Sequence, residues 1–219
     1  MRSSLVLYLA FAAAAAACGT DNAGQPQPDA GSGGDAALGA PDLDVISKDV
    51  TLDPHQEVTY CYYFHTPNTS NLAIKKWVSD MTDGSHHMIM FFDSGGGSPP
   101  PDGTLDSQNC GFGGGAGGTT SFPVWVYASQ TMHGELDLPA DDGTGKPLGM
   151  DVPPNTAAYF QMHYLNPGDT PIVAHVHLQG FAHPAGTTYT KTAAYITYNG
   201  NISIAPNAMN FAETQNNLV

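Results

Sequence analysis

Beyond Leu43 the chain alternates between apolar and polar positions with a period of two, and clusters of turn residues interrupt this pattern at short intervals. Such alternation sends successive side chains to opposite faces of a strand, and no segment sustains the 3.6-residue period of an amphipathic helix. The segments richest in β-branched and aromatic residues are 58–64, 73–78, 87–92, 124–128, 157–165, 172–181 and 192–198. Many short strands of this kind predict an all-β protein, an antiparallel, jelly-roll-like β-sandwich with little helix.

The segments between these strands are rich in residues that favour turns. Asp83-Gly84-Ser85 precedes the third strand, a low-complexity run of Gly, Ser and Pro occupies 94–101, and a second, glycine-rich run occupies 111–118. The composition agrees with a turn-rich β protein, with 25 Gly, 17 Pro and only 12% charged residues. The length of 219 residues predicts one domain, which we place at residues 43–219.

The N-terminal residues predict export from the cell. Residues 1–17 combine Arg2 with an apolar run from Leu5 to Ala17, which fits a secretory signal and is shorter than the ~20 residues that span a bilayer. Ala15-Ala16-Ala17-Cys18 resembles a bacterial lipobox, in which Cys18 carries the lipid; a plain Ala-x-Ala cleavage is the alternative. We therefore expect a cell-envelope protein, either an outer-membrane lipoprotein that touches the membrane only through this anchor or a periplasmic or extracellular protein. Residues 18–42 have almost no bulky apolar side chains, which predicts a flexible tether.

The charge balance excludes one class of partner. The chain has 6 Lys plus Arg against 20 Asp plus Glu, a net charge of -14. A nucleic-acid binder needs a basic surface to displace counterions from phosphates, so no nucleic-acid partner is expected. The nine histidines outnumber the six fixed cations, which directs attention to metal chemistry.

Two cysteines remain when Cys18 is assigned to the anchor. Cys61 lies in a predicted strand and Cys110 beside the glycine-rich run, 49 positions later. In an exported protein the two are expected to form a disulfide, and a cysteine-based metal site is the alternative.

Two of the histidines are adjacent. His86 and His87 follow the Asp-Gly-Ser turn at the start of a strand. Neighbouring side chains of a regular strand point to opposite faces, so the pair can share one ion only where the backbone bends, and the turn supplies such a place. Neutral imidazole binds copper and zinc well, but a third ligand is required. His163, near the end of strand 157–165, is a candidate, although a lone histidine in a strand is more often structural.

The two segments together resemble a known family. His86-His87-Met88-Ile89-Met90-Phe91, followed by Gln161-Met162-His163-Tyr164-Leu165-Asn166-Pro167, is similar to the N-terminal domain of the copper type II, ascorbate-dependent monooxygenases. This family includes peptidylglycine alpha-hydroxylating monooxygenase and dopamine beta-monooxygenase. Thr59-Tyr60-Cys61, the stretch 123–139 and Asn201-Ile202-Ser203-Ile204-Ala205-Pro206 extend the resemblance over about residues 43–211. Ser129 departs from it, since the family usually has Trp there, and several of the family's cysteines are missing.

The resemblance implies both a site and a function. It implies that His86, His87 and His163 hold an electron-transfer copper, which receives its electrons from ascorbate or a similar reductant. It also implies that Gln161 lies on the route of the electron and that Cys61 pairs with Cys110. In the family a second domain holds the copper that binds oxygen, and the sequence ends at Val219, where that domain would begin. We therefore expect an oxidoreductase that is incomplete alone and needs a second copper domain or a partner protein. The alternatives are a surface lipoprotein that binds or buffers copper without oxygenase activity, and a purely structural sandwich.

His175-Val176-His177 offers a second candidate metal site. The resemblance makes strand 172–181 the hairpin partner of strand 157–165, so that His163 pairs near position 174 and the two histidines face away from it. Surface or packing roles are the alternative for this pair. His55, His65, His133 and His183 are expected to be solvated, and Met88, Met90 and Met162 to belong to the core rather than to bind Cu(I).

Overall fold

The computed structural model describes residues 39–93, 98–108, 110 and 123–195. The signal segment, Cys18, most of the tether, the glycine run 111–118 and the motif 201–206 lie outside these residues. The described part contains thirteen strands and no helix, which confirms the all-β prediction. It accordingly has no helix of the length and apolarity that crossing a membrane requires.

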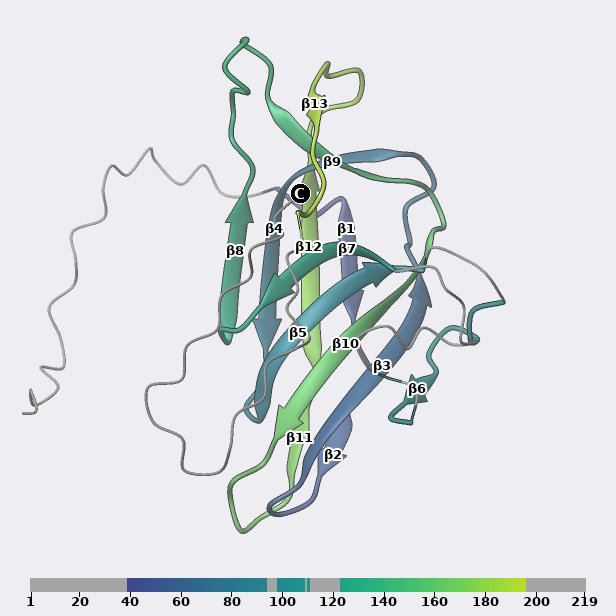
Figure 1. Cartoon of the computed structure of the whole chain (residues 1–219), viewed down its shortest axis with the longest axis vertical. Coiled ribbons are helices and arrows are strands. Elements are labelled where there is room, and N and C mark those ends of the chain that lie inside the picture. The colour runs from purple at the N-terminus through teal and green to yellow at the C-terminus, as the bar shows by residue number, and fades with distance from the viewer. Residues whose placement is uncertain (1–38, 94–97, 109, 111–122, 196–219) are drawn as a thin grey trace, which may run out of the picture. The chain divides into compact units, whose positions relative to one another are not determined.

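One sheet of five strands carries both histidine segments. Its order is β6 (Leu105–Asp106), β3 (Glu57–His65), β10 (Ala157–Leu165), β5 (Ser85–Phe92) and β7 (Val124–Ser129), and all neighbours are antiparallel. Figure 1 shows β10 between β3 and β5. Because β10 is central, its residues 158–164 have a paired neighbour on both β3 and β5.

The second sheet packs against the first. Its strands are β1 (Leu43–Ile46), β12 (Val176–Ala182), β4 (Leu72–Met81), β9 (Leu148–Val152) and β13 (Thr190–Lys191), with β8 (His133–Asp137) also paired to β4. A small third sheet joins β11 (Ile172–Ala174) to β2 (Val50–Leu52). All of these pairs are antiparallel except that of β9 and β13.

The core lies between the two larger sheets. Trp77 and Leu178 reach it from β4 and β12, and Met88 and Phe160 reach it from β5 and β10; all four are fully buried. Burying a side chain of this size stabilises the fold by about 1.5–3 kcal/mol. Because successive strand residues alternate in direction, the residues next to these core positions on β5 and β10 face outward. The histidines occupy that outward face.

Segment 172–181 differs from the prediction. It is interrupted at His175, and its two parts pair with strands other than β10: β11 pairs with β2, and β12 pairs with β1 and β4. The predicted pairing of His163 near position 174 is therefore wrong. The physical reason is that Val176 and Leu178 bury their side chains from the opposite sheet, which requires the chain to cross the sandwich after β10.

Other boundaries also differ. The predicted strand at 192–198 is not found over its described part, because β13 ends at Lys191. The short strands β1, β2, β6, β8 and β9 were not predicted. Strands of two to five residues contain too few alternating positions to reveal a period.

The outward face of the five-stranded sheet has a small apolar cluster of its own. Cys61 and Cys110 form a disulfide with Cα atoms 5.3 Å apart, as predicted for this pair. Cys61 lies there with Ile89 and with the aromatic side chains Tyr63, Phe91 and Tyr159. Rings in this cluster approach to centroid distances of 5.1–5.4 Å. The disulfide thus links the segment around Cys110 to the same sheet face that carries the histidines.

Reduction of this disulfide is expected to lower the free energy of unfolding by about 4 kcal/mol, because the cross-link closes a loop of 49 residues. Denaturant unfolding of the oxidised and reduced protein measures the difference. A Cys61→Ala/Cys110→Ala variant is the control, since reductant should not change its stability. A difference below about 1 kcal/mol between the oxidised and reduced protein would contradict the expectation.

Candidate metal centre

The pairing of β5 with β10 places two histidines directly opposite each other. His87 pairs with His163, and on the other side of β10 His163 pairs with Thr59 of β3. Directly opposed residues of antiparallel strands share a face of the sheet, with Cβ atoms about 4.5–5.5 Å apart. The centroids of the His87 and His163 rings lie 5.1 Å apart. Two ligands contributed by segments far apart in the sequence therefore meet through strand register alone.

A β-bulge brings in the third histidine. The register runs from His163 opposite His87 to Tyr164 opposite Ser85, so His86 is the extra residue. A bulge redirects a side chain at the point where it interrupts the ladder. The His86 ring consequently lies on the same face as the others, with its centroid 5.0 Å from that of His163. The bend that the sequence analysis required for adjacent histidines is thus present.

The turn before the bulge requires a glycine. Gly84 has a backbone φ of 85°, a conformation that residues with a Cβ atom rarely adopt. A Cβ at this position would also lie 2.5 Å from Cδ1 of Ile172. The backbone oxygen of Gly84 accepts a hydrogen bond from the amide of Leu165 at 2.7 Å. This hydrogen bond holds the turn against the end of β10, and the start of β5 therefore lies beside His163.

The three imidazoles form one compact group. The Nδ1 atoms of His86 and His87 lie 3.2 Å apart, and all three residues offer a ligand nitrogen within 4.8 Å of the others. Among the residues that the structure describes, no other set of three His, Cys, Asp or Glu side chains meets this condition. His86 is exposed and the other two are half-buried, so the site lies at the surface with one accessible side.

The electrostatic environment favours the metal-binding form of His87. Burial lowers the pKa of its imidazole, and the neighbouring His163 and His86 lower it further by repulsion of a positive charge. A neutral imidazole has a free lone pair and needs no deprotonation before it binds an ion. The lone pair of His87 is therefore more readily available to a cation than that of an ordinary histidine.

Glu57 completes the surroundings of His163. The Nε2 atom of His163 donates a hydrogen bond to Oε1 of Glu57 at 2.9 Å. Glu57 lies at the start of β3, opposite Leu165 and diagonal to His163. The sequence analysis did not identify Glu57, because only the register of β3 against β10 brings it near. The sequence did offer one signal: Glu57 precedes Cys61 by four positions, so the two side chains point to the same, outward face if both lie on one strand.

The methionines near the histidines do not take part. Met88, Met90 and Met162 are fully buried in the core, on the face of the sheet opposite to the imidazoles. The Sδ atom of Met162 accepts a hydrogen bond from the hydroxyl of Tyr164 at 3.3 Å. The expectation that these methionines belong to the core is confirmed.

Gln161 lies near the cluster, two residues before His163 on the same face of β10. It is buried, and it pairs with Cys61 on one side and with Ile89 on the other. It thus lies between the histidines and the disulfide.

The remaining histidines each have a polar partner other than a second histidine. His175 pairs with Asp49 at 3.0 Å and His177 with Asp44 at 2.5 Å. The others are His55 with Asp169, His65 with Asp102, His133 with Asp80, and His183 with the backbone oxygen of Leu148. His175 and His177 belong to no group of three ligands among the described residues. Pairing with a carboxylate accounts for both of them without a metal.

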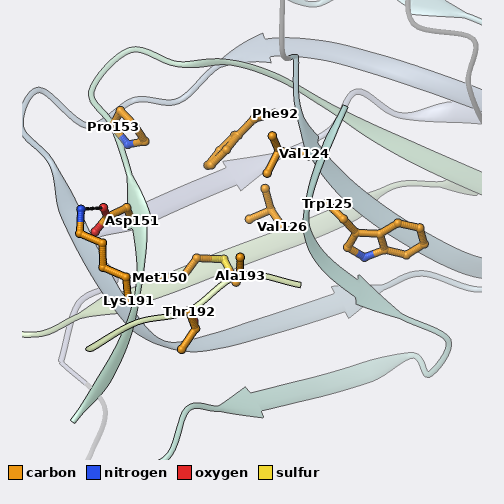
Figure 2. A pocket seen from close by; sticks show the side chains of 10 residues that line it. All are labelled: Phe92, Val124, Trp125, Val126, Met150, Asp151, Pro153, Lys191, Thr192 and Ala193. Carbon is orange, nitrogen blue, oxygen red and sulfur yellow. Dashed lines mark hydrogen bonds and ion pairs between the residues drawn. The ribbon is translucent and has the colours of Figure 1, made fainter. Parts of the chain in front are cut away.

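A separate hollow of about 220 Å³ lies near β7, β9 and β13 (Figure 2). Its lining is mainly apolar and includes Phe92, Val126 and Met150, while Lys191 forms an ion pair with Asp151 at one side. None of the three clustered histidines lines it. The hollow and the histidine cluster are therefore distinct features.

No protein-family model matches the chain, and a search of curated proteins finds no significant match. The residues of the cluster themselves therefore carry the argument for function.

The metal-free protein should show a pKa for His87 below that of an ordinary histidine. Because the pKa in the folded state lies below the usual value of about 6.5, the unfolded state binds a proton more readily. The free energy of unfolding should therefore fall as the pH drops through about 6.5 toward the folded pKa. NMR titration of the chelator-treated protein measures this value. His163→Ala should move the pKa of His87 back up, since it removes a repulsive neighbour, whereas an unchanged pKa in that variant would contradict the assignment of cause.

Proposed function

We propose that residues 43–219 form the copper-binding domain of an exported protein similar to the copper type II, ascorbate-dependent monooxygenases. In this proposal His86, His87 and His163 hold the electron-transfer copper. The supporting observation is the convergence of these three imidazoles, from two distant segments, on one exposed face. The resemblance of the same two segments to the family supports the proposal independently of the geometry.

The donor set fits copper. Three imidazoles and no carboxylate in the innermost group suit copper or zinc better than magnesium or calcium, which prefer oxygen ligands. Among divalent first-row ions the affinity of nitrogen sites is highest for Cu²⁺. The choice of copper over zinc in the proposal comes from the family resemblance and is tested below by metal analysis.

The residues of the chain would bind, orient and expose the ion. Bound copper would supply one-electron transfer between a reductant such as ascorbate and an acceptor. The exposed His86 leaves one side of the cluster open to a small reductant, while the half-buried His87 and His163 would attach the ion to the sheet. With three imidazoles as ligands, copper could still accept a further ligand.

Hydroxylation would require a second copper held elsewhere. Within the described residues the cluster is the only group of three metal-ligating side chains. We propose that a further copper domain or a partner protein supplies the oxygen-activating site. Copper binding or buffering without oxygenase activity is the competing function, and it uses the same three histidines.

The purified mature protein should bind one copper ion at this cluster. Substitution of His86, His87 or His163 by Ala should weaken binding by more than the roughly 10- to 100-fold typical of changes outside the ligand shell. Metal analysis after dialysis and competition with a chromophoric chelator measure stoichiometry and affinity. A His175→Ala/His177→Ala variant is the matched control and should retain full binding. Wild-type protein without copper, or copper unaffected by His163→Ala, would contradict the proposal.

Redox cycling separates the two functions. If the site transfers electrons, ascorbate should abolish the Cu(II) electron paramagnetic resonance signal, and an added one-electron acceptor should restore it. A buffering site should instead hold Cu(I) tightly and resist reoxidation. The His163→Ala protein serves as the comparison, because any signal that survives there comes from copper bound elsewhere.

A further inference from the structure

The hydrogen bond between Glu57 and His163 determines which ring nitrogen of His163 is free to bind a metal. His163 has only two ring nitrogens, and its Nε2 donates to Oε1 of Glu57 at 2.9 Å. A nitrogen that donates a hydrogen has no lone pair for a metal. The nitrogen that remains for an ion is therefore Nδ1, which matches the Nδ1 atoms that His86 and His87 direct at each other.

The location of Glu57 suits a role in orientation. It lies on β3, a different strand from any of the three histidines, and its carboxylate reaches diagonally across to β10. The side chain of Glu57 is 62% exposed, whereas that of His163 is 21% exposed. The carboxylate is thus accessible to solvent at the edge of the site, while the ring that it contacts is largely covered.

We infer that Glu57 is a positioning residue for the metal centre. By accepting the Nε2 hydrogen, it fixes the tautomer and ring angle of His163 so that Nδ1 faces His86 and His87. Carboxylates that accept the second ring hydrogen of a metal-bound histidine orient the ligand and increase its basicity. This inference rests on the proposed metal-binding function of the cluster. It adds a residue that the resemblance does not supply.

The chain provides a matched control on the same strand. His65, at the other end of β3, forms a comparable contact with Asp102 at 2.7 Å. This contact also joins a ring nitrogen to a carboxylate, but His65 lies eight positions along β3 from Glu57 and is paired with Ala157 rather than with any of the three histidines. Asp102→Asn therefore neutralises an equivalent histidine partner, as Glu57→Gln does at His163, without altering the proposed site.

The first measurement needs no metal. Long-range proton–nitrogen NMR of the metal-free protein, at a pH where imidazoles are neutral, reports which ring nitrogen of His163 carries the hydrogen. The wild type and Asp102→Asn should show a single Nε2–H tautomer at His163. Glu57→Ala should show a mixture of tautomers. A simple attraction between the Glu57 charge and a cation would leave the tautomer unchanged, so this readout isolates positioning.

The second measurement is copper affinity by chelator competition. Glu57→Ala should bind copper about 10- to 100-fold more weakly than the wild type. Glu57→Gln keeps an oxygen that can accept the hydrogen but lacks the charge, so it should fall between the two; Asp102→Asn should match the wild type. If Glu57→Ala fails to fold, as judged by thermal unfolding, Glu57→Leu, which also lacks a hydrogen-bond acceptor but fills more of the same space, takes its place in both readouts.

The outcomes separate this inference from the proposed function. Wild-type tautomer and affinity in folded Glu57→Ala or Glu57→Leu would overturn the inference while leaving the metal site intact. An equal loss of affinity in Asp102→Asn would also overturn it, because the effect would then not depend on His163. If the wild type binds no copper, the proposed function fails, and the inference about the metal fails with it even where the tautomer result holds.

Discussion

The candidate site depends on a single irregularity in one strand pairing, the bulge at His86 between β5 and β10. Without the extra residue, His86 would point into the sandwich and only His87 would face His163. The positive φ of Gly84 and its hydrogen bond to Leu165 fix where β5 begins and hence where the bulge falls. The register, the turn and the bulge therefore act together: changing any one of them would separate the three imidazoles.

The all-β fold class and the need for a bend at His86 could be predicted from sequence because both depend on local signals, whereas the grouping of His163 with His86 and His87 was implied by the family resemblance. Alternation over long strands such as β3, β4 and β10 gave the all-β class, and the adjacency of His86 and His87 beside a turn indicated where a bend was needed. The course of the chain after β10 could not be predicted from the same signals. The Asn166-Pro167-Gly168-Asp169 turn favours a hairpin, yet β11 and β12 cross to other sheets because their apolar side chains fill the core from the opposite side. Glu57 was missed for a related reason, since its contact with His163 is created by register across two strands.

The nine histidines fall into two groups that the composition alone does not distinguish. Six of the nine have an aspartate or a backbone carbonyl as partner, and these contacts satisfy a ring nitrogen without any metal. The other three lie together, and among the described residues Glu57 is the carboxylate that contacts them. An acidic chain pairs its histidines readily, so an imidazole group left with one carboxylate is a stronger indication of metal binding than the histidine count itself.

Anomalous X-ray diffraction at the copper edge, from crystals of the copper-loaded protein, tests the central claim most directly. The proposed function predicts one copper peak within about 2.0–2.1 Å of a ring nitrogen of each of His86, His87 and His163, the usual length of a metal–imidazole bond. A peak bound by only one or two of these histidines, a peak at His175 and His177 instead, or no copper peak in loaded crystals would contradict it.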